Sequence, residues 1–218
     1  MAKALILGQF FCKWLDQYLR FGTDLRLVPS FNIMEVCTVN IKGVGGHTVD
    51  KLFCHDMYEV HLRSPNIVVP LIGDNDVNAN TSPEVIARKM VAFATLLHKK
   101  YGVKHIVLCQ LMPRFPVMLY PVGVAGIHNN KNEAADRNYK DMYCRLAKEV
   151  NDIVQSKVSA YPYLTFLDHN SKFAFDRLQV REKFCSDGIH LSPKGQWHLY
   201  KSLRGALLSA CYKITHKH

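Results

Sequence analysis

The sequence predicts an α/β domain in which five parallel strands form one sheet between two layers of helices, an α/β/α sandwich. Five short apolar runs alternate with stretches of helical periodicity along the 218 residues, an order typical of parallel sheets. The run at 66–72 is almost wholly apolar, which suits a strand covered on both faces. Glycine and polar residues follow the first three runs, and ligands of such sheets bind beyond the carboxyl ends of the strands.

Strands are expected where the apolar runs are short and bounded by turn residues, at 3–8, 35–41, 66–72, 105–112 and 163–167. The second run alternates between two sets of side chains, as a strand does. Pro70 is unusual in the third strand, because proline gives up one hydrogen bond of the ladder.

Helices are expected at 11–21, from Val49 through Phe53, and at 83–101, 134–158 and 193–212. Thr48 and Ser82 are typical N-caps, and Gly102 is a typical helix end. Two long irregular stretches remain, at 113–132 and 168–191. Loops of this length in compact domains are usually functional or mobile.

The chain length suits a single domain covering residues 1–218. Hydrophobic residues make up 48% of the chain, which is enough for a substantial core and more than a disordered chain would hold. No apolar run reaches the roughly 18 to 20 residues of a membrane span. No secretory signal is recognisable at the N-terminus either. We therefore expect no transmembrane segment.

The seven cysteines show neither a CxxC pair nor a regular framework. This pattern favours reduced thiols in an intracellular, most simply cytoplasmic, protein. Cysteine and histidine do not cluster at ligand spacing, and His47, His55 and His61 match no metal motif. We expect no metal and no cofactor.

The formal net charge of +10 favours anionic partners such as nucleic acid, acidic lipid or an acidic protein. Simple solubility explains the same charge and is slightly favoured over any specific polyanion role. Lysine and arginine are spread along the chain, without an arginine-rich tail or an RNA-binding aromatic signature. The charge alone therefore does not choose a partner, and the oligomeric state stays open.

Four motifs lie at the ends of predicted strands or before the last helix: Gly8-Gln9-Phe10, Gly43 to Thr48, Gly73-Asp74-Asn75-Asp76 and Asp187-Gly188-Ile189-His190. The third has the form GxND and the fourth the form DxxH. In these motifs the sequence resembles the SGNH (GDSL) hydrolase family, named for a Ser, a Gly, an Asn and a His in separate blocks. With Pro113-Arg114 after the fourth strand, it looks most like the esterase-type domains of invertebrate genes and some non-LTR retrotransposons. The resemblance spans nearly the whole chain and implies a five-stranded parallel, flavodoxin-like sheet.

The resemblance also implies roles in ester hydrolysis. A serine at the end of the first strand would attack a small ester, His190 would take the serine proton, and Asp187 would orient the imidazole. Gly46 and Asn75 would form the oxyanion hole.

The first motif departs from the family, which expects Gly-Asp-Ser. Here Phe10 stands at the serine position, and a benzyl group cannot attack a carbonyl. Losing a triad serine typically removes about a millionfold of rate. Cys12 lies two residues later and should point elsewhere, as a small buried hydrophobe. Water activated by His190 is the other substitute.

Each retained residue also has a structural interpretation. Gly46 and Gly73 would satisfy special backbone angles, Asn75 would tie two loops together, and Asp187 and His190 would form a satisfied structural pair. All of these residues together at the right strand ends favour the fold but do not establish activity. The order of hypotheses is a catalytically impaired domain that acts by binding, then an active hydrolase with an altered nucleophile, then a decayed gene copy.

Overall fold

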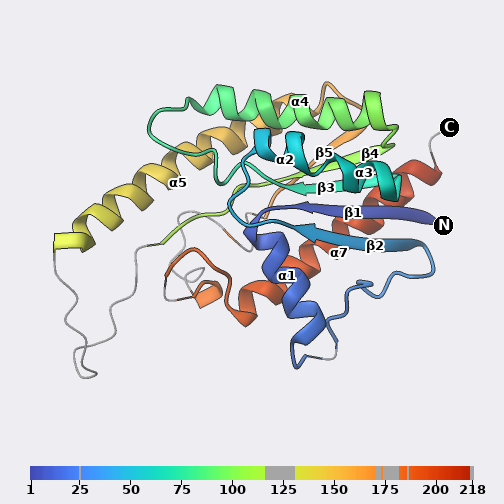
Figure 1. Cartoon of the computed structure of the whole chain (residues 1–218), viewed down its shortest axis with the longest axis horizontal. Coiled ribbons are helices and arrows are strands. Elements are labelled where there is room, and N and C mark those ends of the chain that lie inside the picture. The colour runs from blue at the N-terminus through green and yellow to red at the C-terminus, as the bar shows by residue number, and fades with distance from the viewer. Residues whose placement is uncertain (25, 116–130, 170–172, 174–181, 186, 217–218) are drawn as a thin grey trace.

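A computed structural model of the chain describes residues 1–24, 26–115, 131–169, 173, 182–185 and 187–216 (Figure 1). The middle of the first expected loop, 116–130, lies outside the described residues. So does much of the second expected loop.

One sheet of five strands forms the centre of the molecule, and its strand order is β2-β1-β3-β4-β5. All neighbouring strands run parallel. This is the flavodoxin-like order, so the predicted fold class is confirmed. The strands are β1 (Ala2–Gly8), β2 (Cys37–Gly43), β3 (Ile67–Leu71), β4 (His105–Cys109) and β5 (Leu164–Leu167).

Pro70 is accommodated in β3 by a difference in length between the two flanking ladders. On one side, β3 pairs with β1 along its whole length, with Pro70 opposite Leu7. On the other side, pairing with β4 covers only Ile67 and Val68 and ends before the proline. The missing proline N–H therefore falls where no β4 partner is paired.

Helices cover both faces of the sheet (Figure 1). α1 (Phe10–Phe21) and α7 (Pro193–Thr215) pack on one face, where their apolar sides share a core cluster with β1 and β3. The other face carries α2 (Val49–His55), α3 (Met57–Arg63), α4 (Pro83–Tyr101) and α5 (Lys131–Val158). Burial of these two apolar layers is the main driving force for the fold.

The structure adds one helix that the sequence did not predict. The segment after Thr48 is two short helices, α2 and α3, which meet at Asp56. α3 ends at Ser64 in the left-handed conformation, with φ of 44°. Asp56 and Ser64 interrupt what would otherwise be a single helical pattern, so apolar spacing alone did not reveal the break.

Element ends differ from the prediction by a few residues. β2 begins at Cys37 and ends at Gly43, two residues later than expected at each end. β4 ends at Cys109 rather than at residue 112, because Leu111 and Met112 turn from the sheet to bond Asn151 and Asp74. The last helix continues to Thr215.

None of the seven cysteines forms a disulfide. In the part of the chain that the structure describes, no helix has the length and apolar character needed to cross a bilayer.

Candidate active site

The carboxyl ends of β1, β2 and β3 lie side by side and bring the first three motifs together. Gly8 closes β1 against β3, and a Cβ at Gly8 would lie 2.3 Å from the Leu71 carbonyl oxygen. Only glycine allows this approach. The Val44 amide donates to the Gly8 carbonyl over 2.9 Å, which ties the end of β2 to the end of β1.

Asp187 and His190 form a hydrogen-bonded pair just before α7. His190 Nδ1 lies 2.6 Å from Asp187 Oδ2, and the backbone amides of Ile189 and His190 donate to Asp187 Oδ1 over 2.8 and 2.9 Å. Partial burial opposes the carboxylate charge, but these hydrogen bonds outweigh it and hold the pKa of Asp187 below its usual range. An ionised carboxylate only accepts, so His190 Nδ1 carries the proton and Nε2 is the basic atom of the neutral ring.

The loop that carries this pair is fixed at both ends. Phe184 and Leu191 form an antiparallel bridge at its base. Gly188 has φ of +71°, and a Cβ there would lie within 1.9 Å of the Phe115 carbonyl oxygen. The buried Lys140 on α5 donates through Nζ to the Asp187 carbonyl over 2.7 Å. The imidazole is therefore held in place by the surrounding backbone.

Phe10 is the first residue of α1 and lies directly after β1. Its ring centroid is 5.5 Å from that of His190, with the two planes 74° apart, an edge-to-face contact. Trp14, one turn later on α1, contacts the same imidazole with a centroid distance of 5.4 Å. Two aromatic rings thus lie against His190, whose side chain is still 39% exposed.

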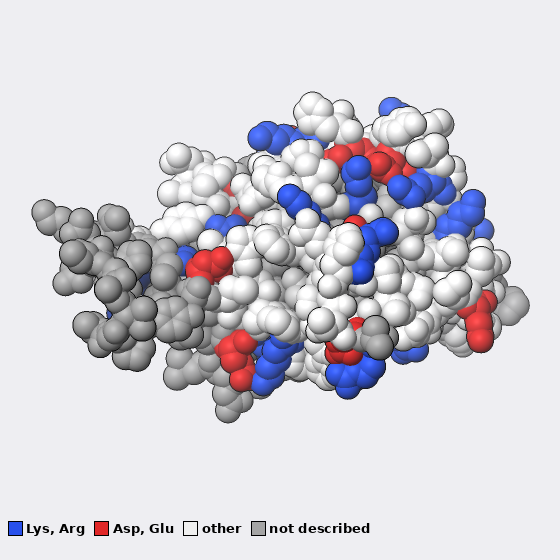
Figure 2. Space-filling model, turned by 60° about the horizontal axis from the view of Figure 1, so that its bottom comes forward, with Lys and Arg blue, Asp and Glu red and all other residues white. Residues whose placement is uncertain are grey.

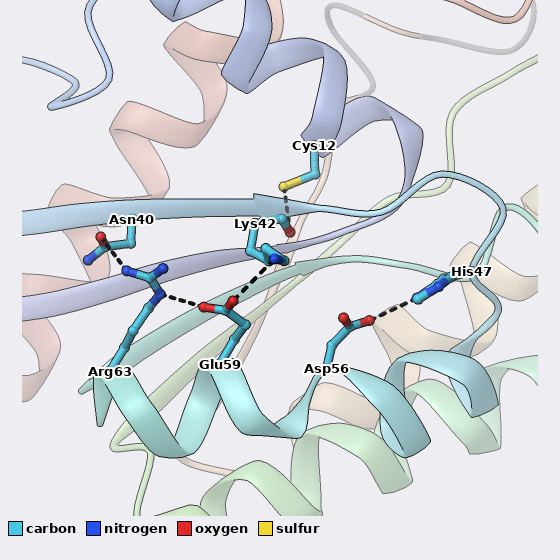
Figure 3. A network of polar contacts seen from close by, with 7 residues as sticks. All are labelled: Cys12, Asn40, Lys42, His47, Asp56, Glu59 and Arg63. Carbon is cyan, nitrogen blue, oxygen red and sulfur yellow. Dashed lines mark hydrogen bonds and ion pairs between the residues drawn. The ribbon is translucent and has the colours of Figure 1, made fainter.

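Cys12 points away from this site, as expected. Its Sγ lies 3.5 Å from the Ile6 carbonyl oxygen and 3.3 Å from the Lys42 carbonyl oxygen. Figure 3 shows the contact with Lys42. Complete burial raises the pKa of the Cys12 thiol far above its usual range. A thiol in this position is a core side chain and no nucleophile.

Asn75 Nδ2 donates to the carbonyl oxygen of His47 over 3.0 Å. Gly46, the residue before His47, has φ of +75° in the left-handed region that favours glycine. The GxND segment and the end of β2 are therefore joined, as the resemblance implies for oxyanion-hole residues. The same hydrogen bond also fits a purely structural role, in which Asn75 ties the two loops together.

Gln9 is fully buried between these two segments. With its amide oriented so that both ends are satisfied, its oxygen accepts from the amides of Gly73 and Asp74 at 3.1 and 3.0 Å, and its nitrogen donates to the His47 carbonyl at 3.1 Å. Gln9 also lies directly beside the Asn75 amide. The side chain at the Asp position of the first motif thus joins all three strand ends.

Asp74, the variable residue of GxND, has a structural role below the site. It is buried, and its Oδ1 accepts from the Tyr143 hydroxyl at 2.9 Å and the Met112 amide at 3.3 Å. Burial raises the pKa of Asp74 to about 6, against the opposing effect of the nearby Arg114 guanidinium. Arg114 stacks on Tyr143 at 4.0 Å and donates to the Asp74 carbonyl at 3.2 Å.

A second imidazole–carboxylate pair lies behind the oxyanion segment. His47 Nδ1 is 2.8 Å from Oδ2 of the buried Asp56, and the two side chains point toward each other from the two ends of α2 (Figure 3). The His47 and His55 rings are 6.2 Å apart. Across the described ranges, no group of three His, Cys, Asp or Glu side chains forms a metal site.

A charged network next to it ties α3 to the edge strand β2. Glu59 accepts from Lys42 at 3.2 Å and from Arg63 at 2.8 Å, and Arg63 also donates to Asn40 at 2.9 Å (Figure 3). This network holds α3 in place, and α3 begins directly after Asp56, the partner of His47.

The sequence predicted Phe10, Asp187 and His190 as catalytic positions, with Gly46 and Asn75 as the oxyanion hole. The structure brings Phe10 and Asp187 into contact with His190, and it joins Asn75 to the segment that follows Gly46. Gln9, Trp14 and Lys140 were not predicted as contacts of the site. The DxxH pattern gives no indication of a lysine on a distant helix. Trp14 was predictable, because it lies four residues after Phe10 on the same helix.

No family model matches the sequence, and no curated protein matches it either. Solved structures do match in fold. A GDSL-like lipase from Bacteroides thetaiotaomicron VPI-5482 has 16% identity and a TM-score of 0.65, with 96% of this chain and 89% of that chain covered. The lipase/acylhydrolase from Enterococcus faecalis has 15% identity and a TM-score of 0.62, with 96% of each chain covered. The chain has the SGNH hydrolase fold.

A third matched structure is an acetyl esterase mutant with an acetate ion, which has 13% identity and a TM-score of 0.61, with 98% of this chain and all of that chain covered. At these identities the matches speak for the SGNH fold alone, and the activity has to be argued from the residues of the site.

Proposed function

We propose that this chain is a catalytically impaired SGNH-fold domain that acts by binding an anionic partner. The observation that carries the proposal is the contact between Phe10 and His190. A phenyl ring lies edge-on against the imidazole, where the family mechanism requires a hydroxyl. Without that hydroxyl, no covalent acyl-enzyme forms.

The surroundings of Phe10 support the impaired assignment. Trp14 covers a second side of the His190 ring, and Cys12 is turned into the core. Gln9 joins the three strand ends with its amide and fills the space beside Asn75. A carbonyl oxygen entering between Asn75 and the end of β2 would have to displace this amide.

The anionic partner is supported by the net charge of +10. Two classes fit this charge, nucleic acid and acidic lipid. The test is anisotropy of a labelled single-stranded oligonucleotide and co-sedimentation with phosphatidylserine vesicles, each at about 50 mM and about 200 mM salt. We expect binding to at least one of them, and the binding should weaken as salt is added. Failure of both at low salt would remove the anionic partner.

An active hydrolase is the second candidate, favoured by the 2.6 Å hydrogen bond between Asp187 and His190. An imidazole held in this way remains a general base and could activate water against a small ester. Hydrolysis of p-nitrophenyl acetate separates the two functions. The impaired domain gives the same background rate for the wild type and His190→Ala. Turnover that disappears in His190→Ala would replace the binding function with an enzyme.

A further inference from the structure

Both tryptophans of the chain lie on the same face of the sheet, one on α1 and one on α7. Trp14 is 48% exposed, although large aromatic side chains are usually covered. Phe21, two turns later on α1, is 82% exposed, and Tyr18 lies between them at helical spacing. α1 therefore presents an open aromatic stripe that begins at the His190 contact.

The stripe leads into a hollow of about 320 Å³ between α1 and the first turns of α7. Rings line it from both helices: Tyr18 from α1, and Trp197 and His198 from α7. Charged residues lie at the same hollow, namely Arg26, Lys194 and Asp24. The hollow therefore combines aromatic faces with cationic side chains.

Cations in the hollow and beside it are available to an anion. Lys201 does not line the hollow, but its Nζ lies 4.5 Å from the centre of the Trp197 ring, which does, and among the described residues no carboxylate forms an ion pair with it. Arg26 pairs with Asp24 and Lys194 pairs with Glu182, but these pairs lie at the surface, where an ion pair contributes little. A phosphate can compete for such cations at small cost.

From these contacts we infer that single-stranded nucleic acid binds across the hollow between α1 and α7, with bases stacked on Trp14 and Trp197 and phosphates on Lys201, Lys194 and Arg26. Aromatic platforms beside cations are the common means of binding single strands, because every base has a face that stacks. The inference rests on the proposed function, since it names the partner class and its location.

The charges of the hollow favour a nucleic acid over a lipid bilayer. The exposed Trp14 and Phe21 are side chains that a bilayer could bind, but the lining of the hollow beside them bears charges of both signs, which an apolar membrane contact does not accommodate. The side of the molecule that carries α1 and α7 shows lysine and arginine in separate small groups, with acidic residues near them (Figure 2).

The experiment uses the intrinsic fluorescence of the chain, because its only two tryptophans lie at the proposed surface. A single strand of about 12 nucleotides is titrated into the wild type at low salt. We expect quenching in the wild type and in both single-tryptophan variants, Trp14→Phe and Trp197→Phe. Trp14→Ala should bind about tenfold more weakly, through the loss of one stacked base. Lys201→Gln should reduce the slope of log affinity against log salt by about 0.7.

Two variants on the opposite face serve as matched controls. Tyr58 on α3 is 66% exposed, so Tyr58→Ala removes an exposed ring as Trp14→Ala does. Lys100 on α4 lies over the Tyr101 ring, as Lys201 lies over Trp197, so Lys100→Gln removes a matched cation. Both controls should bind the strand as the wild type does.

Three results would overturn the inference and leave the proposed function in place. The strand could bind with no quenching and with wild-type affinity in Trp14→Ala. Heparin, a polyanion without bases, could quench as strongly as the strand, which would show that binding depends on charge and not on stacked bases. Vesicles could bind while the strand does not. The proposed function itself would fail on a different result, namely ester turnover that depends on His190.

Discussion

At the scale of single residues, the proposed loss of catalysis rests on Phe10 and Gln9. Phe10 lies edge-on to His190, and Gln9 joins the ends of three strands with its amide. The backbone that would present a nucleophile is intact, since α1 still begins directly after β1. The loss of function that we propose therefore lies in two side chains and leaves the fold unchanged.

Restoring those two side chains should restore chemistry. The double variant Gln9→Asp with Phe10→Ser places a hydroxyl beside a His190 that Asp187 already orients through a 2.6 Å hydrogen bond. We expect p-nitrophenyl acetate hydrolysis above the wild-type rate, with a further variant, His190→Ala, returning it to background. A folded double variant no faster than the wild type would show that the site has lost more than its nucleophile.

Asp74 gives the molecule a pH dependence with a defined sign. Burial raises the pKa of Asp74 to about 6 from a usual value of 3.8. Between these values the folded state keeps a proton that the unfolded state has released, so the free energy of unfolding falls as the pH rises through this window. The contribution is complete below the unfolded pKa and is lost above the folded one.

Asp74→Asn removes this titration and keeps an oxygen that can accept from Tyr143. Urea unfolding between about pH 4 and about pH 7 should show a change in free energy that is about 2–3 kcal/mol smaller in the variant than in the wild type. Parallel pH curves for the two proteins would mean that Asp74 is ionised throughout.

The sequence predicted much of the site because its motifs are local. Asp187 and His190 are three residues apart, and their pairing follows from one short loop. Asn75 and Gly46 lie at strand ends whose adjacency follows from the sheet order. Gln9 and Lys140 were missed because their contacts join segments far apart in the chain, which no local pattern records.

Helix ends determine how the elements hold the site. Ser192 caps α7 two residues after His190, and its Oγ accepts from the Gly195 amide at 3.3 Å and donates to the Glu182 carbonyl at 2.8 Å. The caps and turns read from the sequence were correct at Thr48, Ser82 and Gly102, because capping depends on a few neighbouring residues. The break at Asp56 was missed, because no proline or glycine marks it.

Ser192→Ala should lower the free energy of unfolding by about 1 kcal/mol, through the loss of the cap. Ser209→Ala, at an exposed position within the same helix, is the matched control and should change stability by less than about 0.5 kcal/mol. Urea denaturation of both variants at neutral pH measures the difference. Equal effects would show that the Ser192 hydroxyl does not cap α7.

The whole molecule keeps its seven cysteines as free thiols, and burial sorts them by reactivity. Cys54 and Cys185 are exposed, whereas Cys12 and Cys109 are buried with pKa values raised far above the usual thiol range. Titration of the native protein with a chromogenic disulfide should give two fast thiols, assigned by Cys54→Ser and Cys185→Ser. The four buried thiols should react only after unfolding, and the half-buried Cys144, whose Sγ contacts the Arg114 backbone, should react at an intermediate rate. Fast modification of native Cys12 would contradict its position in the core and would make Cys12 a candidate nucleophile again.

The sheet order and its two helical layers were predictable because alternating strands and helices permit few topologies. The partner was not predictable in the same way, since a charge of +10 is shared by many functions. The α1–α7 hollow required the fold, because Tyr18 and Trp197 are far apart in sequence and meet only across two helices.

Covalent labelling with a fluorophosphonate probe, followed by intact mass, tests the central claim most directly. An activated serine or cysteine nucleophile would be tagged at the rate set by its general base. With Phe10 against His190, we predict no adduct on the wild type and an adduct on the Gln9→Asp, Phe10→Ser double variant. A wild-type adduct that disappears in His190→Ala would contradict the account and establish a working hydrolase.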